Sequence, residues 1–291
     1  MQQITRICTA LVDDLCRPFA LGPQQVYIGT SIGITLAPTH ASTTEELLRL
    51  GDIALYQAKA AGRNTWRVYT AAMNTQLVER RHLEDDLRRA LNEGQLRLHY
   101  QPRYATADGT LRSCEALVRW QHPQRGLLPP DLFIPLAEDT GLIQPLGRWV
   151  LETACREAAR WPDDIGVSVN LSPGQFGEHS DIPGDVARAL HASGLPAHRL
   201  ELEITERVLL AHDQAARATL QALKDLGVRL SLDDFGTGFS SLAYLRRYPL
   251  DGIKIDRSFI AELASSGNDR AIVQALGDLG RSLGITVTAE G

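Results

Sequence analysis

Residues 200–236 have the sequence LELEITERVLLAHDQAARATLQALKDLGVRLSLDDFG, and this stretch decides the fold. Apolar and polar residues alternate in LELEITE (200–206) and again in VRLSLDDFG (228–236), which is the pattern of a β-strand. Between them, residues 212–226 carry apolar side chains at helical spacing. Two strands joined by a helix run parallel in one sheet, because the helix carries the chain back to the end of the sheet at which the first strand began. The stretch therefore predicts a strand–helix–strand unit.

The same alternation continues on both sides of this unit. Strand–helix alternation over about 200 residues predicts a parallel sheet, with another helix at 269–283. Seven strands of this kind favour an α/β protein with a TIM-type (β/α)8 barrel that lacks its last strand. An open doubly wound sheet is the alternative, although the glycine pattern of a dinucleotide fold is missing. The expected strands are LRLHYQPRY, SCEALVRW, GVSVNLS, LELEITE, VRLSLDDFG, DGIKIDR and TVTAEG.

Composition and charge exclude several classes of protein. The chain is 44% hydrophobic and 22% charged, as globular proteins are. No apolar run approaches the roughly 18 residues that cross a bilayer. The net charge of −5 argues against a partner such as duplex nucleic acid. The four cysteines have no CxxC spacing and the eight histidines form no HExxH motif. We therefore expect reduced thiols, a cytoplasmic chain and no histidine-rich metal site.

Two regions precede the alternating part. The sequence of residues 1–69 predicts a helix, a strand pair, a second helix and a strand. The second helix has a capping box at its start and is expected to end at Gly62. A connecting helix is expected at 70–94, because Leu83, Leu87 and Leu91 recur at four-residue steps. We therefore expect three segments, at 1–69, 70–94 and 95–291.

Polar residues gather near the ends of the predicted strands. In a parallel barrel these ends converge on one face, where active sites are built. A strand-end carboxylate taken alone more often caps a helix or accepts a hydrogen bond from a loop. Several of them at one mouth would repel each other unless divalent cations neutralised them, and Mg²⁺ or Mn²⁺ suits such oxygen ligands. The residues are Glu115, Asn170, Glu203, Glu206, Asp233, Asp234, Lys254, Asp256 and Glu290.

The adjacent pair Asp233 and Asp234 is the clearest signal in this set. Neighbouring carboxylates repel each other, and a buried carboxylate without a partner is costly. A pair of hard cations would resolve this conflict, with Asp233 bridging the two ions and Asp234 holding the second. Gly236 and Gly238 would let the following loop fold back towards a ligand.

The motifs also make residues 82–291 similar to an EAL domain, the family that degrades the bacterial second messenger cyclic di-GMP. The resemblance implies hydrolysis of cyclic di-GMP to linear pGpG, with two ions activating water and stabilising the leaving oxygen. It also implies a homodimer through this domain. The motifs are YQP (100–102), EALVRW (115–120), FIPLAEDTGLI (133–143), LGRWVL (146–151), VNLS (169–172), LELEITE (200–206), LDDFGTGFSSL (232–242), KIDRSF (254–259) and AEG (289–291).

The resemblance implies a role for each matching residue. The first metal ion would be held by Glu115, Asn170, Glu203 and Asp233, and the second by Asp233 and Asp234. Lys254 matches the lysine beside the attacking water, and Glu290 a late carboxylate acting on that water or metal. These two residues and the aspartate pair form the predicted catalytic set. Glu206 matches the glutamate that anchors the loop after Asp234. Gln101 and Arg119 are similar to substrate contacts, with Arg119 on a phosphate. A surface salt bridge is the alternative for Arg119.

Residues 1–69 resemble the C-terminal part of a GGDEF domain, the cyclic di-GMP synthase, through TSIGITL (30–36) and DIALYQAKAAGRN (52–64). The GG(D/E)EF signature itself is not present, so Lys59 and Arg63, which match triphosphate contacts, are expected to be solvated. The EAL family continues past AEG to a strand that closes the barrel. The resemblance therefore implies a tandem GGDEF–EAL protein truncated at both ends, whose parent could be anchored in a membrane through a missing N-terminal region.

Two alternatives to an active enzyme stay open. A non-catalytic cyclic di-GMP receptor would share the fold, although retention of Glu115, Lys254 and the aspartate pair favours the enzyme. The chain as given, with open apolar strand edges, could also fail to fold into a functional unit.

Overall fold

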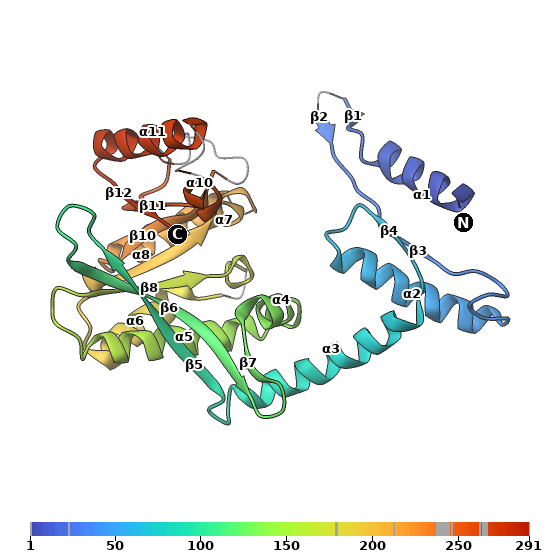
Figure 1. Cartoon of the computed structure of the whole chain (residues 1–291), viewed down its shortest axis with the longest axis horizontal. Coiled ribbons are helices and arrows are strands. Elements are labelled where there is room, and N and C mark those ends of the chain that lie inside the picture. The colour runs from blue at the N-terminus through green and yellow to red at the C-terminus, as the bar shows by residue number, and fades with distance from the viewer. Residues whose placement is uncertain are drawn as a thin grey trace. The chain divides into compact units, whose positions relative to one another are not determined.

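The computed structural model describes residues 2–22, 24–177, 180–211, 213–236, 245, 247–261, 263 and 267–290 (Figure 1). The chain divides into two compact units, 1–85 and 86–291. Helix α3 (Ala71–Ala90) crosses this division. The three segments expected from the sequence, at 1–69, 70–94 and 95–291, stay a prediction.

The first unit contains two helices and four short strands before α3. They are α1 (Gln2–Leu15), β1 (Phe19–Leu21), β2 (Gln24–Val26), β3 (Ile32–Ile34), α2 (Thr44–Ala60) and β4 (Trp66–Val68). Strands β1 and β2 pair antiparallel, and β3 and β4 pair parallel. Residues 27–31 belong to neither β2 nor β3, so the chain from Gln24 to Ile34 is not one continuous strand.

Helix α2 begins at the expected cap. The hydroxyl of Thr43 accepts a hydrogen bond from the Glu46 amide at 3.3 Å, as an N-cap threonine does. The helix packs closely on β3, since a Cβ on Gly33 would lie 2.2 Å from the carbonyl oxygen of Gly51. Lys59 and Arg63 are exposed beyond the last buried turn, as predicted.

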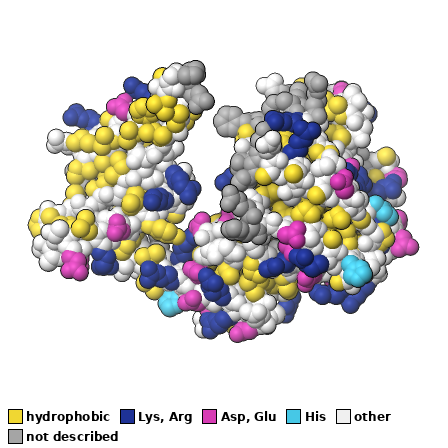
Figure 2. All heavy atoms as spheres, turned by 180° about the vertical axis from the view of Figure 1, so that it is seen from behind, with side chains coloured by type: hydrophobic (Ala, Val, Ile, Leu, Met, Phe, Trp, Pro, Cys, Tyr) yellow, Lys and Arg dark blue, Asp and Glu magenta, His cyan; other side chains and the backbone are white. Residues whose placement is uncertain are grey.

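Large apolar side chains of the first unit reach the solvent. Figure 2 shows hydrophobic side chains gathered on this unit. The most exposed of them include Leu21 and Tyr27, and α1 adds Ile7 and Leu11. An apolar surface of this kind is typical of contact with another protein segment.

The second unit is built on one sheet with the order β12-β11-β10-β9-β8-β6-β5, and β7 pairs with β6. All seven strands expected from the sequence form. Six of them, from β6 to β12 along this order, run parallel. The strands are β5 (Leu96–Tyr104), β6 (Leu111–His122), β7 (Gly126–Leu128), β8 (Gly166–Leu171), β9 (Leu200–Thr205), β10 (Arg229–Phe235), β11 (Gly252–Ile255) and β12 (Thr286–Ala289).

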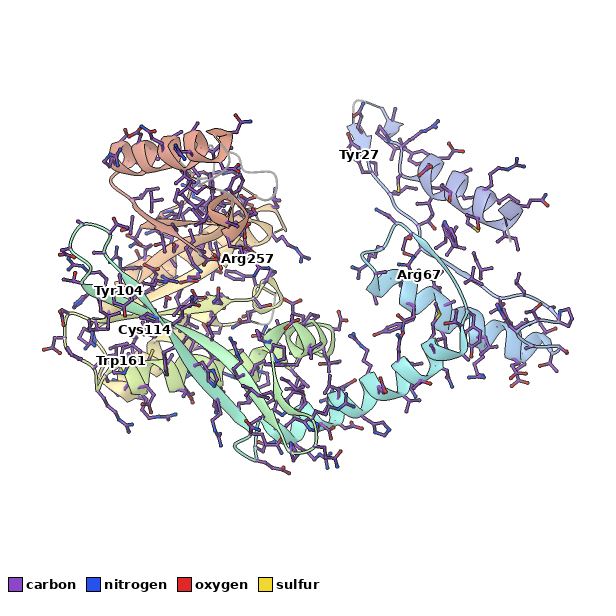
Figure 3. All side chains as sticks on the ribbon, viewed as in Figure 1. Tyr27, Arg67, Tyr104, Cys114, Trp161 and Arg257 are labelled. Atoms are coloured by element: carbon purple, nitrogen blue, oxygen red, sulfur yellow. The ribbon has the colours of Figure 1, made fainter. Side chains whose placement is uncertain are left out.

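Strand β5 runs antiparallel to β6, so the expectation of a wholly parallel sheet was wrong at this edge. The connection between the two strands covers only residues 105–110, which is too short for a crossover helix. It closes as a hairpin in which the Ala105 amide donates to Thr110 and Gly109 has a φ of 68°. Figure 3 labels Tyr104 and Cys114 on the two strands that this hairpin joins.

Helices pack against the outer face of the sheet. Alternate residues of β8, β9, β10 and β11 are apolar and buried there, such as Val167 in β8, Leu202 in β9 and Ile253 in β11. The intervening residues, which are mostly polar, face the inner side. The helices are α4 (Pro130–Thr140), α5 (Ile143–Ala158), α6 (Ile182–Ser193), α7 (Glu206–Ala211), α8 (Asp213–Asp225), α10 (Arg257–Ala261) and α11 (Gly267–Leu283), with 3-10 turns η1 (Pro173–Gln175) and η2 (Ala197–Arg199).

The positions of two helices agree with the sequence. Helices α8 and α11 fall where residues 212–226 and 269–283 predicted them. Across the described ranges, none of the helices combines the length and apolar character that a bilayer crossing requires.

Candidate functional site

The inner face of the sheet carries the predicted site residues at neighbouring positions. Asn170 of β8 stands beside Glu203 of β9, and Ser231 of β10 stands on the other side of Glu203. Residues in register on parallel strands project to the same side, so the polar residues of successive strands meet there. Glu115 lies in the interior of β6, not at its end, but its register partner is Ser168, two residues before Asn170.

Lys254 binds four of the predicted carboxylates. Its side-chain nitrogen lies 2.6 Å from Glu203 Oε2, 3.1 Å from Asp233 Oδ1, 3.2 Å from Glu115 Oε2 and 2.5 Å from Glu290 Oε1. The lysine is 1% exposed although it carries a charge. A buried ammonium group is tolerated only with such partners, so Lys254 and the carboxylates stabilise one another.

Arg103, which the sequence analysis did not single out, completes the cluster. It comes from β5 and its guanidinium donates to Glu115 Oε2 at 3.0 Å, to Glu201 Oε1 at 2.9 Å and to Glu203 Oε1. Strand alternation contained the signal, because Arg103 is two residues from Gln101 and Glu201 is two residues from Glu203. Both residues therefore share a face with a predicted site residue.

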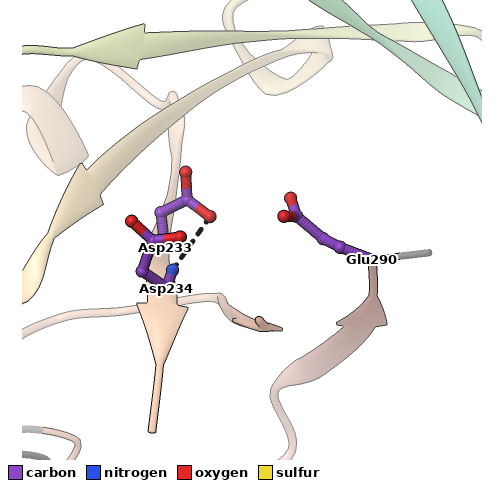
Figure 4. Close-up of side chains that lie close together, drawn as sticks. All are labelled: Asp233, Asp234 and Glu290. Atoms are coloured by element: carbon purple, nitrogen blue, oxygen red, sulfur yellow. Dashed lines mark hydrogen bonds between the residues drawn. The ribbon is translucent and has the colours of Figure 1, made fainter. Parts of the chain in front are cut away.

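The aspartate pair depends on an irregularity in the backbone. In a regular strand, Asp233 and Asp234 would point to opposite faces. Here the pairing of β10 with β11 shifts between Leu232 and Phe235, which is a β-bulge, and Asp234 has a left-handed φ of 54°. The Asp234 amide donates to Asp233 Oδ1 at 3.0 Å. Both carboxylates therefore lie on the same side as Glu290 (Figure 4).

Burial and charge shift the pKa values of the cluster in different directions. Burial opposes ionisation of Glu115, but Lys254 and Arg103 hold its pKa below the usual value. At Asp233 and Glu201 burial prevails, and the pKa of each carboxyl is raised. Burial would lower the pKa of Lys254, but the surrounding carboxylates, with Glu203 first, raise it. Lys254 therefore remains charged at neutral pH.

One part of the cluster fits a hard divalent cation. Asp233, Asp234 and Glu290 each offer a carboxylate oxygen, and these oxygens lie within 4.8 Å of one another. Carboxylate oxygens from separate side chains are the ligands that Mg²⁺ and Mn²⁺ take in proteins. The other predicted ligands, Glu115 and Glu203, accept hydrogen bonds from Lys254 and Arg103. Asn170 donates to Glu115 Oε1 at 2.8 Å.

The remaining predicted residues take other positions in the fold. Gln101 stands directly opposite Glu115 on β5 and is exposed. Arg119 lies four residues beyond Glu115 and donates to the Val118 carbonyl at 2.8 Å. Glu206 is buried at the start of α7, but the loop it was predicted to anchor, at 237–244 and including Gly238, lies outside the described residues. Asp256 caps α10 by accepting from the Ser258 amide at 2.9 Å, so it does not join the carboxylate cluster.

Comparison with known families gives two matches. Residues 84–291 match the model of the EAL domain, and residues 1–65 match that of the diguanylate cyclase, GGDEF domain. The first match covers well over half of the chain.

Named bacterial proteins are similar to this chain along nearly its whole length. The bifunctional diguanylate cyclase/cyclic di-GMP phosphodiesterase MucR of Pseudomonas aeruginosa is 44% identical over 285 residues, which is 97% of this chain and 42% of that protein. The cyclic di-GMP phosphodiesterase PdeR of Escherichia coli is 40% identical over 279 residues, 94% of this chain and 42% of that protein. The chain thus spans about two fifths of the length of these relatives.

A solved structure supports the same assignment. The PaMucR phosphodiesterase in complex with c-di-GMP matches with a TM-score of 0.68 and 47% identity, over 72% of this chain and 86% of that one. The strands, the clustered carboxylates and the family matches therefore agree: the chain belongs to the EAL domain family and carries, ahead of that domain, part of a GGDEF domain.

Proposed function

We propose that this chain hydrolyses cyclic di-GMP to linear pGpG with the help of two divalent cations, Mg²⁺ or Mn²⁺. The observation that carries the proposal is the convergence of Glu115, Glu203, Asp233 and Glu290 on the ammonium group of Lys254. The relatives MucR and PdeR, both named as cyclic di-GMP phosphodiesterases, support the choice of substrate. A site of this charge is suited to cations and, through them, to a phosphodiester.

The proposed metal ligands are Glu115, Asn170, Glu203 and Asp233 for one ion and Asp233 with Asp234 for the other. When bound, such ions supply charge neutralisation and polarise the phosphoryl oxygens during in-line displacement. The bulge at Asp233 and Asp234 orients the two carboxylates before any ion arrives. A preorganised ligand pair lowers the cost of ordering the site on binding.

The chain's own side chains then act on the substrate and on water. Water loses a proton and attacks phosphorus, the phosphorus–oxygen bond to one ribose breaks, and the leaving ribose oxygen takes up a proton as the ring opens to the linear dinucleotide. Lys254, already positioned by four carboxylates, offers positive charge beside the attacking water and the phosphoryl oxygens. Of the four carboxylates that Lys254 contacts, that of Glu290 is the most exposed, with a side-chain exposure of 31%. Glu290 is proposed to act on the attacking water. Gln101 and Arg119 are proposed to contact the substrate, with Arg119 on a phosphate.

The test is turnover of cyclic di-GMP by the purified chain with Mg²⁺ or Mn²⁺, followed by chromatography of pGpG. Asp233→Asn should abolish product formation, because it removes the carboxylate that is proposed as a ligand of both ions. Asp225→Asn is the matched control, since Asp225 is an exposed aspartate on α8 that accepts a hydrogen bond from the nearby Gln221 at 2.9 Å. A folded chain that binds the dinucleotide without turnover would instead be a receptor of cyclic di-GMP.

A further inference from the structure

The guanidinium of Arg103 lies among the carboxylates that are proposed as metal ligands. Arg103 belongs to β5, the antiparallel edge strand, and its side chain is 13% exposed. One of its terminal nitrogens contacts both Glu115 and Glu203, and the other contacts Glu201. These contacts place a fixed positive charge at the position where the first ion is expected.

Every oxygen of Glu115 and Glu203 accepts a hydrogen bond from a protein group. Glu115 Oε1 accepts from Asn170, and Glu115 Oε2 accepts from both Arg103 and Lys254. Glu203 Oε1 accepts from Arg103, and Glu203 Oε2 from Lys254. A divalent ion that binds these two carboxylates therefore competes with these donors and is repelled by the positive charges of Arg103 and Lys254.

Arg103 can leave these oxygens at a lower cost than Lys254. Lys254 contacts four carboxylates, all of which belong to the proposed metal site or to its catalytic set. Arg103 has a separate partner in Glu201, which is not among the proposed metal ligands. When Arg103 gives up Glu115 and Glu203, it keeps this ion pair and is not left as an unpaired buried charge.

We propose that Arg103 is a positioning residue that occupies the Glu115–Glu203 half of the metal site as an internal cation and withdraws towards Glu201 when a divalent ion binds there. The proposal rests on the two-ion site proposed above. The cation position at Asp233, Asp234 and Glu290 does not involve Arg103, so the arginine affects one of the two ions more than the other.

The charge of the site sets the direction of the effect. The carboxylates of Glu115, Glu201, Glu203, Asp233, Asp234 and Glu290 outnumber the cations Arg103, Lys254 and Arg229 by three charges, an excess that favours divalent ions. Without Arg103 the excess rises by one charge, and two carboxylates lose their competing donor. Divalent ions should therefore bind more tightly to a chain that lacks this side chain.

The experiment is calorimetric titration of the full chain with Mn²⁺, comparing the wild type with Arg103→Met and Arg97→Met. Arg97 is the matched control, because it lies on the same face of β5 but donates to the carbonyls of Gly94 and Leu96. We expect Arg103→Met to lower the Kd of one Mn²⁺ by about tenfold or more, since a charge-assisted competitor is lost. Arg97→Met should bind as the wild type does. The melting temperature in chelator should fall in Arg103→Met and recover on addition of Mn²⁺.

Arg103→Lys keeps the proposal testable if Arg103→Met does not fold. A lysine keeps the positive charge, but its ammonium group cannot span three carboxylates as the guanidinium does. Arg103→Lys should therefore also lower the Kd of Mn²⁺, but by less than Arg103→Met. An unchanged or higher Kd in a folded Arg103 variant would overturn the proposal. If neither the wild type nor the variants bind Mn²⁺, the proposed metal site itself is overturned. If an Arg103 variant binds Mn²⁺ and the wild type does not, the result supports Arg103 as the competitor.

Discussion

Lys254→Met removes an ammonium group that contacts four carboxylates in the interior of the sheet. Glu203 is fully buried and Glu115 and Asp233 are nearly so, at 12% and 13% side-chain exposure, which prevents water from replacing the lysine. Removing one partner of a buried ion pair costs about 3–5 kcal/mol. Glu290 is exposed enough to be rehydrated, so it adds little to this cost.

This cost should appear as a lower free energy of unfolding in urea, followed by tryptophan fluorescence in chelator. At about 2–4 °C per kcal/mol for a domain of this size, the melting temperature should fall by roughly 6–20 °C. Mn²⁺ should reduce the difference between variant and wild type, because a bound cation replaces the missing charge. Lys224→Met is the control: Lys224 pairs with Asp251 at 2.7 Å and is 26% exposed, which predicts a loss of about 1 kcal/mol. A loss in Lys254→Met no larger than that of the control would refute the electrostatic reasoning.

Three further predictions concern other parts of the structure. Arg199→Met should cost about 3 kcal/mol in urea unfolding, because the buried guanidinium donates to backbone carbonyls including those of Ala158, Pro162 and Ile165. Gly236→Ala should weaken Mn²⁺ binding in calorimetry while Gly177→Ala does not, since Gly236 has a φ of 105° and an added Cβ would lie 2.7 Å from the ring of Phe259. Burial raises the pKa of Cys155 to about 12 from an ordinary value of 9.0, so the unfolded thiol ionises first and stability should decrease as pH rises through that interval. Iodoacetamide labelling at pH 8, followed by mass spectrometry, should leave Cys155 unmodified until urea unfolds the chain.

The strands and most of the site were predictable because their signals are local. Alternation in LELEITE and VRLSLDDFG places apolar residues outside and carboxylates inside, and the structure has β9 and β10 there. The contacts of Lys254 with Glu203 and Asp233 follow from the convergence of parallel strands. Asp256 shows the limit of that rule, since the same position at a strand end serves as a helix cap.

The features that were missed depend on neighbours that are distant in sequence. Arg103 pairs with Glu203, one hundred residues away, only because β5 reverses direction at the hairpin of residues 105–110. The turn signal Asp108–Gly109 was present, but strand–helix alternation elsewhere in the chain outweighed it. The bulge that turns Asp234 towards Glu290 is set by the pairing of β10 with β11, and the aspartate pair alone does not specify it.

The side chains of Arg103 and Lys254 determine whether the site can form before metal binds. A sheet that brought six carboxylates together without compensation would resist folding until metal was present, as metal-dependent small domains do. Arg103 and Lys254 contact five of those carboxylates between them and keep the buried ones paired. The ligands can therefore assemble on folding and exchange a protein cation for a metal ion afterwards. On this reasoning chelator should leave the wild-type chain folded, and the Arg103 and Lys254 variants should be the ones whose stability depends on Mn²⁺.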